Sequence, residues 1–264
     1  MILIKIGGAA GINYDTVLND VASLYKNNEK ILIVHGGKSE LEAVSTKLGK
    51  PPVWVNTASG FTSRRTDKET MEIFTMVYVG KMNKMIVEKL QQRGVNAVGI
   101  CGMDGKLAVA KKKDIIIVEN AKKKILRDDF TGKIVEINTK VLEALLNAGF
   151  LPVICPSAIS EENHAVNVDG DRLTAMIAEA FKAEKIIYLS NVPGLLKDKD
   201  DESSLIKEIN KENIEEFMGY AKGTMRKKMM GAMEAIEKGV KKVIFADGRI
   251  RNPIQNAEKG TIIS

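Results

Sequence analysis

Six short apolar runs, each about as long as a β-strand, alternate along this chain with segments of helical periodicity. The runs cover residues 2–6, 30–34, 95–101, 150–155, 185–189 and 241–246. Two of the intervening segments, residues 139–148 and 171–181, gather their apolar residues on one helical face. Strands that alternate with helices form a parallel sheet covered by helices on both faces. The pattern therefore predicts an α/β fold, a three-layer αβα sandwich with a central, mainly parallel sheet.

Residues 103–137 break this alternation. Short β-type pieces at 107–109, 115–118 and 134–135 are separated by lysine triplets at 111–113 and 122–124. This arrangement predicts an antiparallel hairpin insertion, with the triplets as solvated turns or as protection of a strand edge. We see no linker, internal repeat or low-complexity stretch, and we expect one domain over residues 1–264.

The composition is that of a globular protein with a sizeable core, since 44% of the 264 residues are hydrophobic and 28% are charged. No apolar run approaches the roughly 20 residues of a spanning helix, and the first residues lack the features of a secretory signal. We therefore expect a cytoplasmic protein that does not bind membranes. The surplus of 40 Lys and Arg over 34 Asp and Glu is spread along the chain without base-stacking aromatics. It argues against a nucleic-acid partner and is compatible with an acidic one.

The cysteines and histidines do not suggest a metal site. Cys101 and Cys155 each end an apolar run and are expected to be buried, inert thiols. His35 and His164 are too few and too far apart to complete a zinc site with them.

Two Gly-Gly pairs follow the first two predicted strands. The first strand ends in Lys5-Ile6-Gly7-Gly8 and the second in His35-Gly36-Gly37. Ligands of open α/β sheets bind at the carboxyl ends of strands, where glycine lets backbone N–H groups approach an anion. Either pair alone is also explained by a tight turn from strand to helix. Together with Lys5, the two pairs favour a phosphate site without a P-loop.

Two further segments combine polar residues with the start of a helix. Asn167, Asp169 and Asp171 alternate just before a helical stripe, which is more than capping requires, although Asp171 alone could be the cap. A calcium loop is excluded because its twelfth position is Ala178 rather than Glu. Residues 223–228 place three basic side chains, ending at Lys228, in a helix's first turn. This charge opposes the helix dipole and indicates either a bound anion or a solvated basic face.

The motifs Lys-x-Gly-Gly, His-Gly-Gly, Arg64-Arg65-Thr66-Asp67, Asn-x-x-x-Asp and Gly-x-Met-x-x-Lys occur in the order seen in the amino-acid kinase superfamily. The resemblance covers essentially the whole chain and is strongest to the acetylglutamate kinase branch. Within that branch the chain resembles the kinases that phosphorylate α-aminoadipate or glutamate carried on the protein LysW. The segment 60–67 is longer than in acetylglutamate kinases, and Lys38 stands where those enzymes have a third glycine.

The resemblance implies specific roles for matching residues. It implies that Lys5 and Lys228 stabilise the transferring phosphoryl group and that Asp171 orients both lysines. The other implied contacts are phosphate binding by Gly7 and Gly8, substrate binding by Gly36, Gly37, Arg64 and Asn167, and nucleotide binding by Ser190, Asn191 and Gly194.

The reaction implied is ATP-dependent phosphorylation of a side-chain carboxylate, which gives an acyl phosphate in lysine and, by extension, arginine biosynthesis. Mg²⁺ would arrive with ATP, LysW would be an acidic partner, and the enzyme would form a homo-oligomer, expected to be a dimer. An acyl-substrate lobe would span about 1–183 and a nucleotide lobe about 184–264. A loose phosphoryl transition state needs mainly positioning and positive charge, and a carboxylate nucleophile needs no general base.

Two other functions fit the sequence. One is N-acetylglutamate kinase of arginine biosynthesis, with the same fold and chemistry. The other is a non-catalytic, amino-acid-sensing homologue, against which the presence of Lys5, Asp171 and Lys228 argues.

Overall fold

A large, mainly parallel sheet forms the centre of the molecule in the computed structural model, which describes residues 1–57, 60, 62–119, 122–210 and 212–264. β1 (Ile2–Ile6) lies in its middle and pairs in parallel with β2 (Ile31–His35) and with β12 (Lys185–Ser190). The sheet extends past β2 through β10 (Leu151–Ser160), β5 (Ala97–Gly102) and β6 (Ala108–Lys112), all parallel, and past β12 through parallel β14 (Lys242–Asp247). The remaining strands are β9 (Gly132–Ile137), β11 (Ala165–Asn167), β13 (Glu208–Ile209) and β15 (Thr261–Ile263). β9, β11 and β15 pair antiparallel with β6, β10 and β14, and β13 pairs in parallel with β15.

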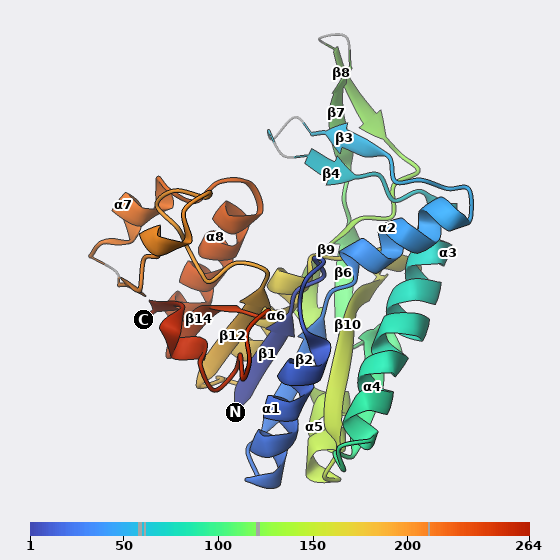
Figure 1. The fold of residues 1–264 in the computed structure, drawn as a ribbon. Coiled ribbons are helices and arrows are strands. Elements are labelled where there is room, and N and C mark those ends of the chain that lie inside the picture. The colour runs from blue at the N-terminus through green and yellow to red at the C-terminus, as the bar shows by residue number, and fades with distance from the viewer. Residues whose placement is uncertain (58–59, 61, 120–121, 211) are drawn as a thin grey trace.

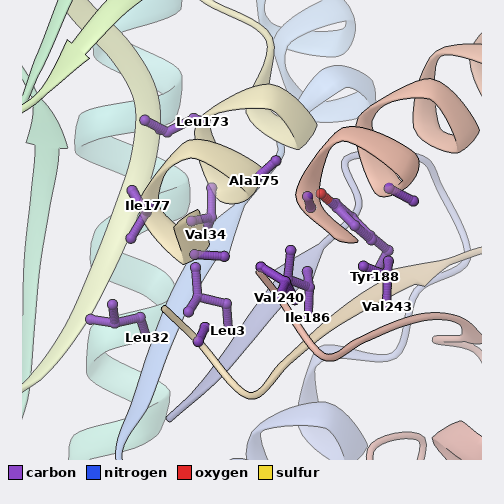
Figure 2. Packing of buried hydrophobic residues seen from close by; sticks show 14 of the residues in the cluster. Leu3, Leu32, Val34, Leu173, Ala175, Ile177, Ile186, Tyr188, Val240 and Val243 are labelled. Carbon is purple, nitrogen blue, oxygen red and sulfur yellow. The ribbon is translucent and has the colours of Figure 1, made fainter. Parts of the chain in front are cut away.

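Helices cover both faces of this sheet, and side-chain alternation along the strands gives each face its own core (Figure 1). Leu3, Ile186 and Tyr188 face α5 (Lys140–Asn147), α6 (Gly170–Ala180) and α8 (Gly223–Glu237), as Figure 2 shows in part. Ile4 and Ile187 face the opposite way, towards α1 (Tyr14–Lys26) and α4 (Asn83–Gln91). The predicted three-layer αβα sandwich is confirmed.

A third cluster packs beside the sheet around α2 (Lys38–Lys47), α3 (Lys68–Thr75) and the π-helix η1 (Met76–Met82). Cys101 and Cys155 are register partners on β5 and β10 in this cluster, where both are buried, free thiols, as expected.

The shorter elements are α7 (Ile214–Met218) and the 3₁₀ turns Asp104–Lys106, Glu202–Ser204 and Ala257–Lys259. No helix within the described residues is both long and apolar enough to cross a bilayer.

Two antiparallel hairpins project beyond the carboxyl ends of the central strands (Figure 1). They are β3 (Trp54–Asn56) with β4 (Thr62–Arg64), and β7 (Ile115–Glu119) with β8 (Lys122–Leu126). An antiparallel bridge between Thr57 and Ile117 joins them. The predicted hairpin insertion is confirmed by the second hairpin, while the first was not expected.

The lysine triplets do not lie wholly in turns, and of the two expectations for them the protection of a strand edge fits residues 122–124, since β8 belongs to a two-stranded hairpin. Lys111 and Lys112 end β6, and residues 122–124 begin β8. The reason is that backbone pairing with β9 and β7 defines these strands, whatever the side chains' preference for water.

Candidate active site

The two Gly-Gly turns meet at the carboxyl ends of β1 and β2, the adjacent positions that the sequence predicted. A Cβ atom on Gly8 would lie 2.4 Å from the Gly37 nitrogen, and one on Gly36 would lie 2.6 Å from the Gly8 nitrogen. The turns therefore pack backbone against backbone, with no space for a side chain at either position. Gly7 is equally confined, because its Cβ would lie 2.8 Å from the Leu189 carbonyl oxygen on β12.

Three charged side chains meet beside these turns, each from a different element. Asp171, in the first turn of α6, contacts Lys5 of β1 through Oδ1 at 2.9 Å and Lys228 of α8 through Oδ2 at 3.0 Å. The side chain of Lys5 is 7% exposed and that of Lys228 is 14% exposed. The candidate catalytic residues therefore form one compact cluster, the lysine–aspartate–lysine triad.

Asp171 is free for these contacts because a different residue caps the helix. The carboxylate of Asp169 is the N-cap of α6 and accepts a hydrogen bond from the Arg172 N–H at 2.9 Å. A Cβ at Gly170 would lie 3.1 Å from Lys5 Cε, so the glycine between the two aspartates leaves space for the lysine. The capping role considered for Asp171 thus belongs to Asp169.

The triad carries a net positive charge. Burial acts to raise the pKa of Asp171, but the charges of Lys5 and Lys228 and their hydrogen bonds outweigh it and hold that pKa well below its usual range. One carboxylate between two ammonium groups leaves an excess of one positive charge in a confined site. Such a site suits the oxygens of a phosphate group.

Arg64 and Asn167 line a common pocket of about 300 Å³ at the base of the hairpins. Three more basic side chains, from Lys38, Lys113 and Lys227, line the same pocket. Arg64 Nε and Nη1 are buried and have no hydrogen-bond partner within the described residues. Because buried N–H groups of a charged side chain are costly without partners, this arrangement favours an anionic ligand.

Tyr78 and Gly37 adjoin this pocket. Tyr78 lies in η1 and packs against Gly37, whose Cβ would be 3.2 Å from its ring. Gly36 and Gly37 do not themselves line the pocket, although Gly37 packs against Tyr78, which does.

A buried carboxylate that the sequence analysis did not single out holds this pocket together. Asp129 accepts hydrogen bonds from the backbone N–H groups of Thr66 and Thr131, both at 2.9 Å. Thr66 then accepts a hydrogen bond at 3.3 Å from the Asn167 side chain. The segment that follows Arg64 and the strand that carries Asn167 are thereby fixed to one point. The only sequence signal was an Asp-Asp pair between two predicted strands.

Ser190, Asn191 and Gly194 line a second pocket, of about 560 Å³. Lys228 lines this pocket too, so one ammonium group belongs both to the triad and to the pocket. Gly194 is required by packing, because its Cβ would lie 2.4 Å from Thr261 Oγ1. Within the described residues, no group of three carboxylate, imidazole or thiol side chains is placed to hold a metal ion.

Fold and site together define an α/β protein with a cationic cleft at the carboxyl ends of its parallel strands, the class that includes small-molecule kinases. The sequence matches the Amino acid kinase family over residues 1–247, and the chain belongs to this family.

Several known proteins are similar over nearly the whole chain. The [LysW]-aminoadipate kinase of Thermus thermophilus is 50% identical, with 98% of each chain covered. A putative [LysW]-aminoadipate/[LysW]-glutamate kinase of Nitrosopumilus maritimus is 40% identical, with coverage of 97% of this chain and 96% of that one. The acetylglutamate kinase of Brachyspira hyodysenteriae is 36% identical, with coverage of 94% and 83%.

Among solved structures, N-acetylglutamate synthase from Neisseria gonorrhoeae, complexed with coenzyme A and N-acetyl-glutamate, has the same fold. The TM-score is 0.80 at 19% identity, over 100% of this chain and 59% of that one.

Proposed function

We propose that this kinase transfers the γ-phosphoryl group of ATP to the side-chain carboxylate of α-aminoadipate or glutamate attached to the carrier protein LysW. The observation that carries the proposal is the lysine–aspartate–lysine triad together with two pockets. One pocket shares Lys228 with the triad, and the other is lined by Arg64, whose buried Nε and Nη1 atoms have no partner within the described residues. The names of the Thermus and Nitrosopumilus relatives support the substrate.

In the proposed reaction, Lys5 and Lys228 contact oxygens of the transferring phosphoryl group. A carboxylate oxygen of the substrate forms a bond to the γ-phosphorus as the bond to the bridging oxygen of ADP breaks. The attacking carboxylate is already ionised near pH 7, so no side chain has to remove a proton. Asp171 orients both ammonium groups before ATP binds, which removes a reorganisation cost from the chemical step.

The two pockets divide the remaining roles. Arg64 and Asn167 hold the α-carboxylate and amide end of the acyl substrate, next to Gly36 and Gly37. Ser190, Asn191 and Gly194 hold the nucleotide, and its phosphates pass Gly7 and Gly8, where the absence of side chains permits close approach. The boundary between an acyl-substrate lobe and a nucleotide lobe near residues 183–184 follows from this division.

Mg²⁺ accompanies the nucleotide in this proposal, neutralising part of the phosphate charge. In the part of the chain that the structure describes, Asp171 is taken up by both lysines and no other carboxylate cluster faces the cleft. The ion is therefore held mainly by phosphate oxygens and water, as Mg²⁺ commonly is.

The carrier would dock over the acyl pocket, where basic residues gather. Lys38 is 57% exposed, with its ammonium 4.9 Å above the Trp54 ring, and burial lowers the pKa of Lys113 on the same pocket. Two observations reduce the basic charge available: Arg65 pairs with Asp128 at 2.5 Å, and Glu42 lies 3.9 Å from Lys38. Because the ion pair of Arg65 is much shorter than that of Lys38, Lys38 is the better candidate for a carrier contact. We also infer a homodimer in the cytoplasm, where a biosynthetic reaction would find its ATP.

A coupled assay of ADP release tests the proposal with three acceptors: carrier-linked aminoadipate, carrier-linked glutamate and free N-acetylglutamate. We expect efficient turnover only with a carrier-linked acceptor. Docking should weaken as salt rises from low to physiological strength, mainly through a slower association rate. Equal use of N-acetylglutamate without salt dependence would favour an acetylglutamate kinase like the Brachyspira relative. No turnover with any acceptor would indicate a sensing homologue.

A further inference from the structure

Tyr188 lies against all three members of the triad, and neither the motifs nor the family resemblance pointed to it. It lies on β12 directly beside Lys5 of β1, and the two are register partners in the parallel ladder. Its hydroxyl donates a hydrogen bond of 3.0 Å to the backbone carbonyl of Asp171. The Nζ atom of Lys228 lies 5.3 Å from the centroid of its ring. Tyr188 is thus joined to Lys5 by strand pairing, to the start of α6 by a hydrogen bond and to α8 through its ring.

We propose that Tyr188 is a positioning residue that holds Lys228 and Asp171 in the geometry needed for phosphoryl transfer. This proposal rests on the function proposed above for the triad. An aromatic face attracts an ammonium group through its quadrupole and accepts no conventional hydrogen bond from it. Lys228 can therefore be held in place by Tyr188 while its N–H groups remain available to Asp171 and to phosphate oxygens.

The surroundings of Tyr188 keep the ring in one orientation. It is 1% exposed, and the Phe245 ring on β14 packs against it with centroids 5.6 Å apart. Figure 2 shows the hydroxyl at the end of the ring away from Val243. Burial, followed by the nearby charges of Asp171 and Asp169, raises the pKa of Tyr188 well above its usual value, so the hydroxyl remains a donor.

The alternative is that Tyr188 is only a large core side chain whose hydroxyl has found an acceptor. Tyr188→Leu and Ile186→Ala separate the two interpretations. Ile186 is buried on the same face of β12, two residues away, and belongs to the same core cluster, so its truncation removes core packing without removing the ring beside Lys228.

In the kinetic test, Tyr188→Leu should lower kcat by about 2- to 30-fold, the range that loss of a cation–π contact gives. The KM for ATP should stay within about twofold, since the loss belongs to the transition state. Tyr188→Phe, which keeps the ring, should lose less, and Ile186→Ala should lower thermal stability with little change in kcat. In a Lys228→Met background, adding Tyr188→Leu should cause no further loss of kcat, because Tyr188 acts through Lys228.

A second measurement does not depend on turnover. In ligand-free protein with ¹⁵N-labelled lysine, the Lys228 ammonium signal, assigned by its disappearance in Lys228→Arg, should shift in Tyr188→Leu and remain in place in Ile186→Ala. An unmoved signal, a loss of kcat matched by Ile186→Ala, or full additivity with Lys228→Met would each overturn the positioning role. If the wild-type enzyme phosphorylates no carboxylate, the proposed function fails, and the ammonium signal still decides the role of Tyr188.

Discussion

Replacing Lys228 by methionine separates the catalytic role of the triad from its structural role. The change keeps the length of the side chain and removes one charge 3.0 Å from Asp171 Oδ2. Asp171 retains Lys5 at 2.9 Å, so its carboxylate is still paired. The cost to folding should therefore fall below the ~3–5 kcal/mol seen when a buried ion pair loses its only partner. Asp171→Asn, which leaves two buried ammonium groups without a carboxylate, should approach that range.

The expected loss of kcat does not follow the loss of folding stability. Loss of a preorganised group that stabilises transition-state charge costs about 10²–10³ in kcat, or ~2.7–4 kcal/mol. Lys228→Met should reach this range although it is the less destabilising of the two variants. Urea unfolding gives the free energy of unfolding for each protein, and the coupled assay gives kcat at saturating ATP and carrier-linked aminoadipate.

Lys227→Met is the matched control, since it removes the same charge one position earlier on α8. Lys227 lines the acyl pocket, whereas Lys228 lines the nucleotide pocket, so the control should mainly raise the KM for the acyl substrate. The reasoning is refuted if Lys228→Met keeps kcat within about threefold of wild type, or if both lysine variants lose kcat equally.

Three further outcomes are expected. Arg64→Met should raise the KM for the acyl substrate by about 10- to 100-fold, the value of a charged hydrogen bond, and leave the KM for ATP nearly unchanged; an equal loss of ATP affinity would place Arg64 in the other pocket. Lys38→Glu should raise the KM for the carrier-linked substrate at low salt and lose this effect at high salt; the same change with a free acceptor would contradict carrier docking. The folded-state pKa of Asp171 is depressed, so its stabilising contribution is fully present above the unfolded-state pKa near ~3.9 and is lost as pH falls through the folded-state value. The difference in free energy of unfolding between wild type and Asp171→Asn should then be constant from about pH 8 to 5 and shrink only in stronger acid, and a decline that began near neutral pH would contradict the depressed pKa.

The sequence predicted those features of the fold and the site that depend on residues close together in the chain or on neighbouring strands. The central strands could be predicted because parallel strands buried on both faces are continuous apolar runs. The meeting of the two glycine turns followed because consecutive strands of an α/β sheet are usually neighbours. The choice between Asp169 and Asp171 as the helix cap could not be made in advance, because the two lie two residues apart at the start of the helix and only the folded structure shows which one faces the lysines.

The contacts that the sequence missed join residues that are distant along the chain. Asp129 binds the Thr66 backbone, and Tyr188 lies beside Lys5, through pairings that no local pattern encodes. The lysine triplets failed for the opposite reason. A run of lysines locally favours a solvated turn, but pairing with β9 and β7 decided the backbone conformation of Lys111, Lys112 and residues 122–124.

The arrangement around Asp171 suggests why a carboxylate is useful in a site that must bind phosphate. Two ammonium groups buried without a counter-ion would repel each other and would carry an uncompensated desolvation cost. Asp171 offsets both effects and leaves a net charge of one positive in the cleft. A phosphate that arrives can then interact with two ammonium groups that are already oriented by β1 and α8.

Since α6 carries the carboxylate and contacts both β1 and α8, any movement of α8 relative to α6 would change the distance between the two positive charges. The Arg172–Glu234 ion pair and the 2.9 Å contact between Lys238 and Glu179 also join α6 to α8, so the geometry of the triad depends on how firmly these two helices are held together.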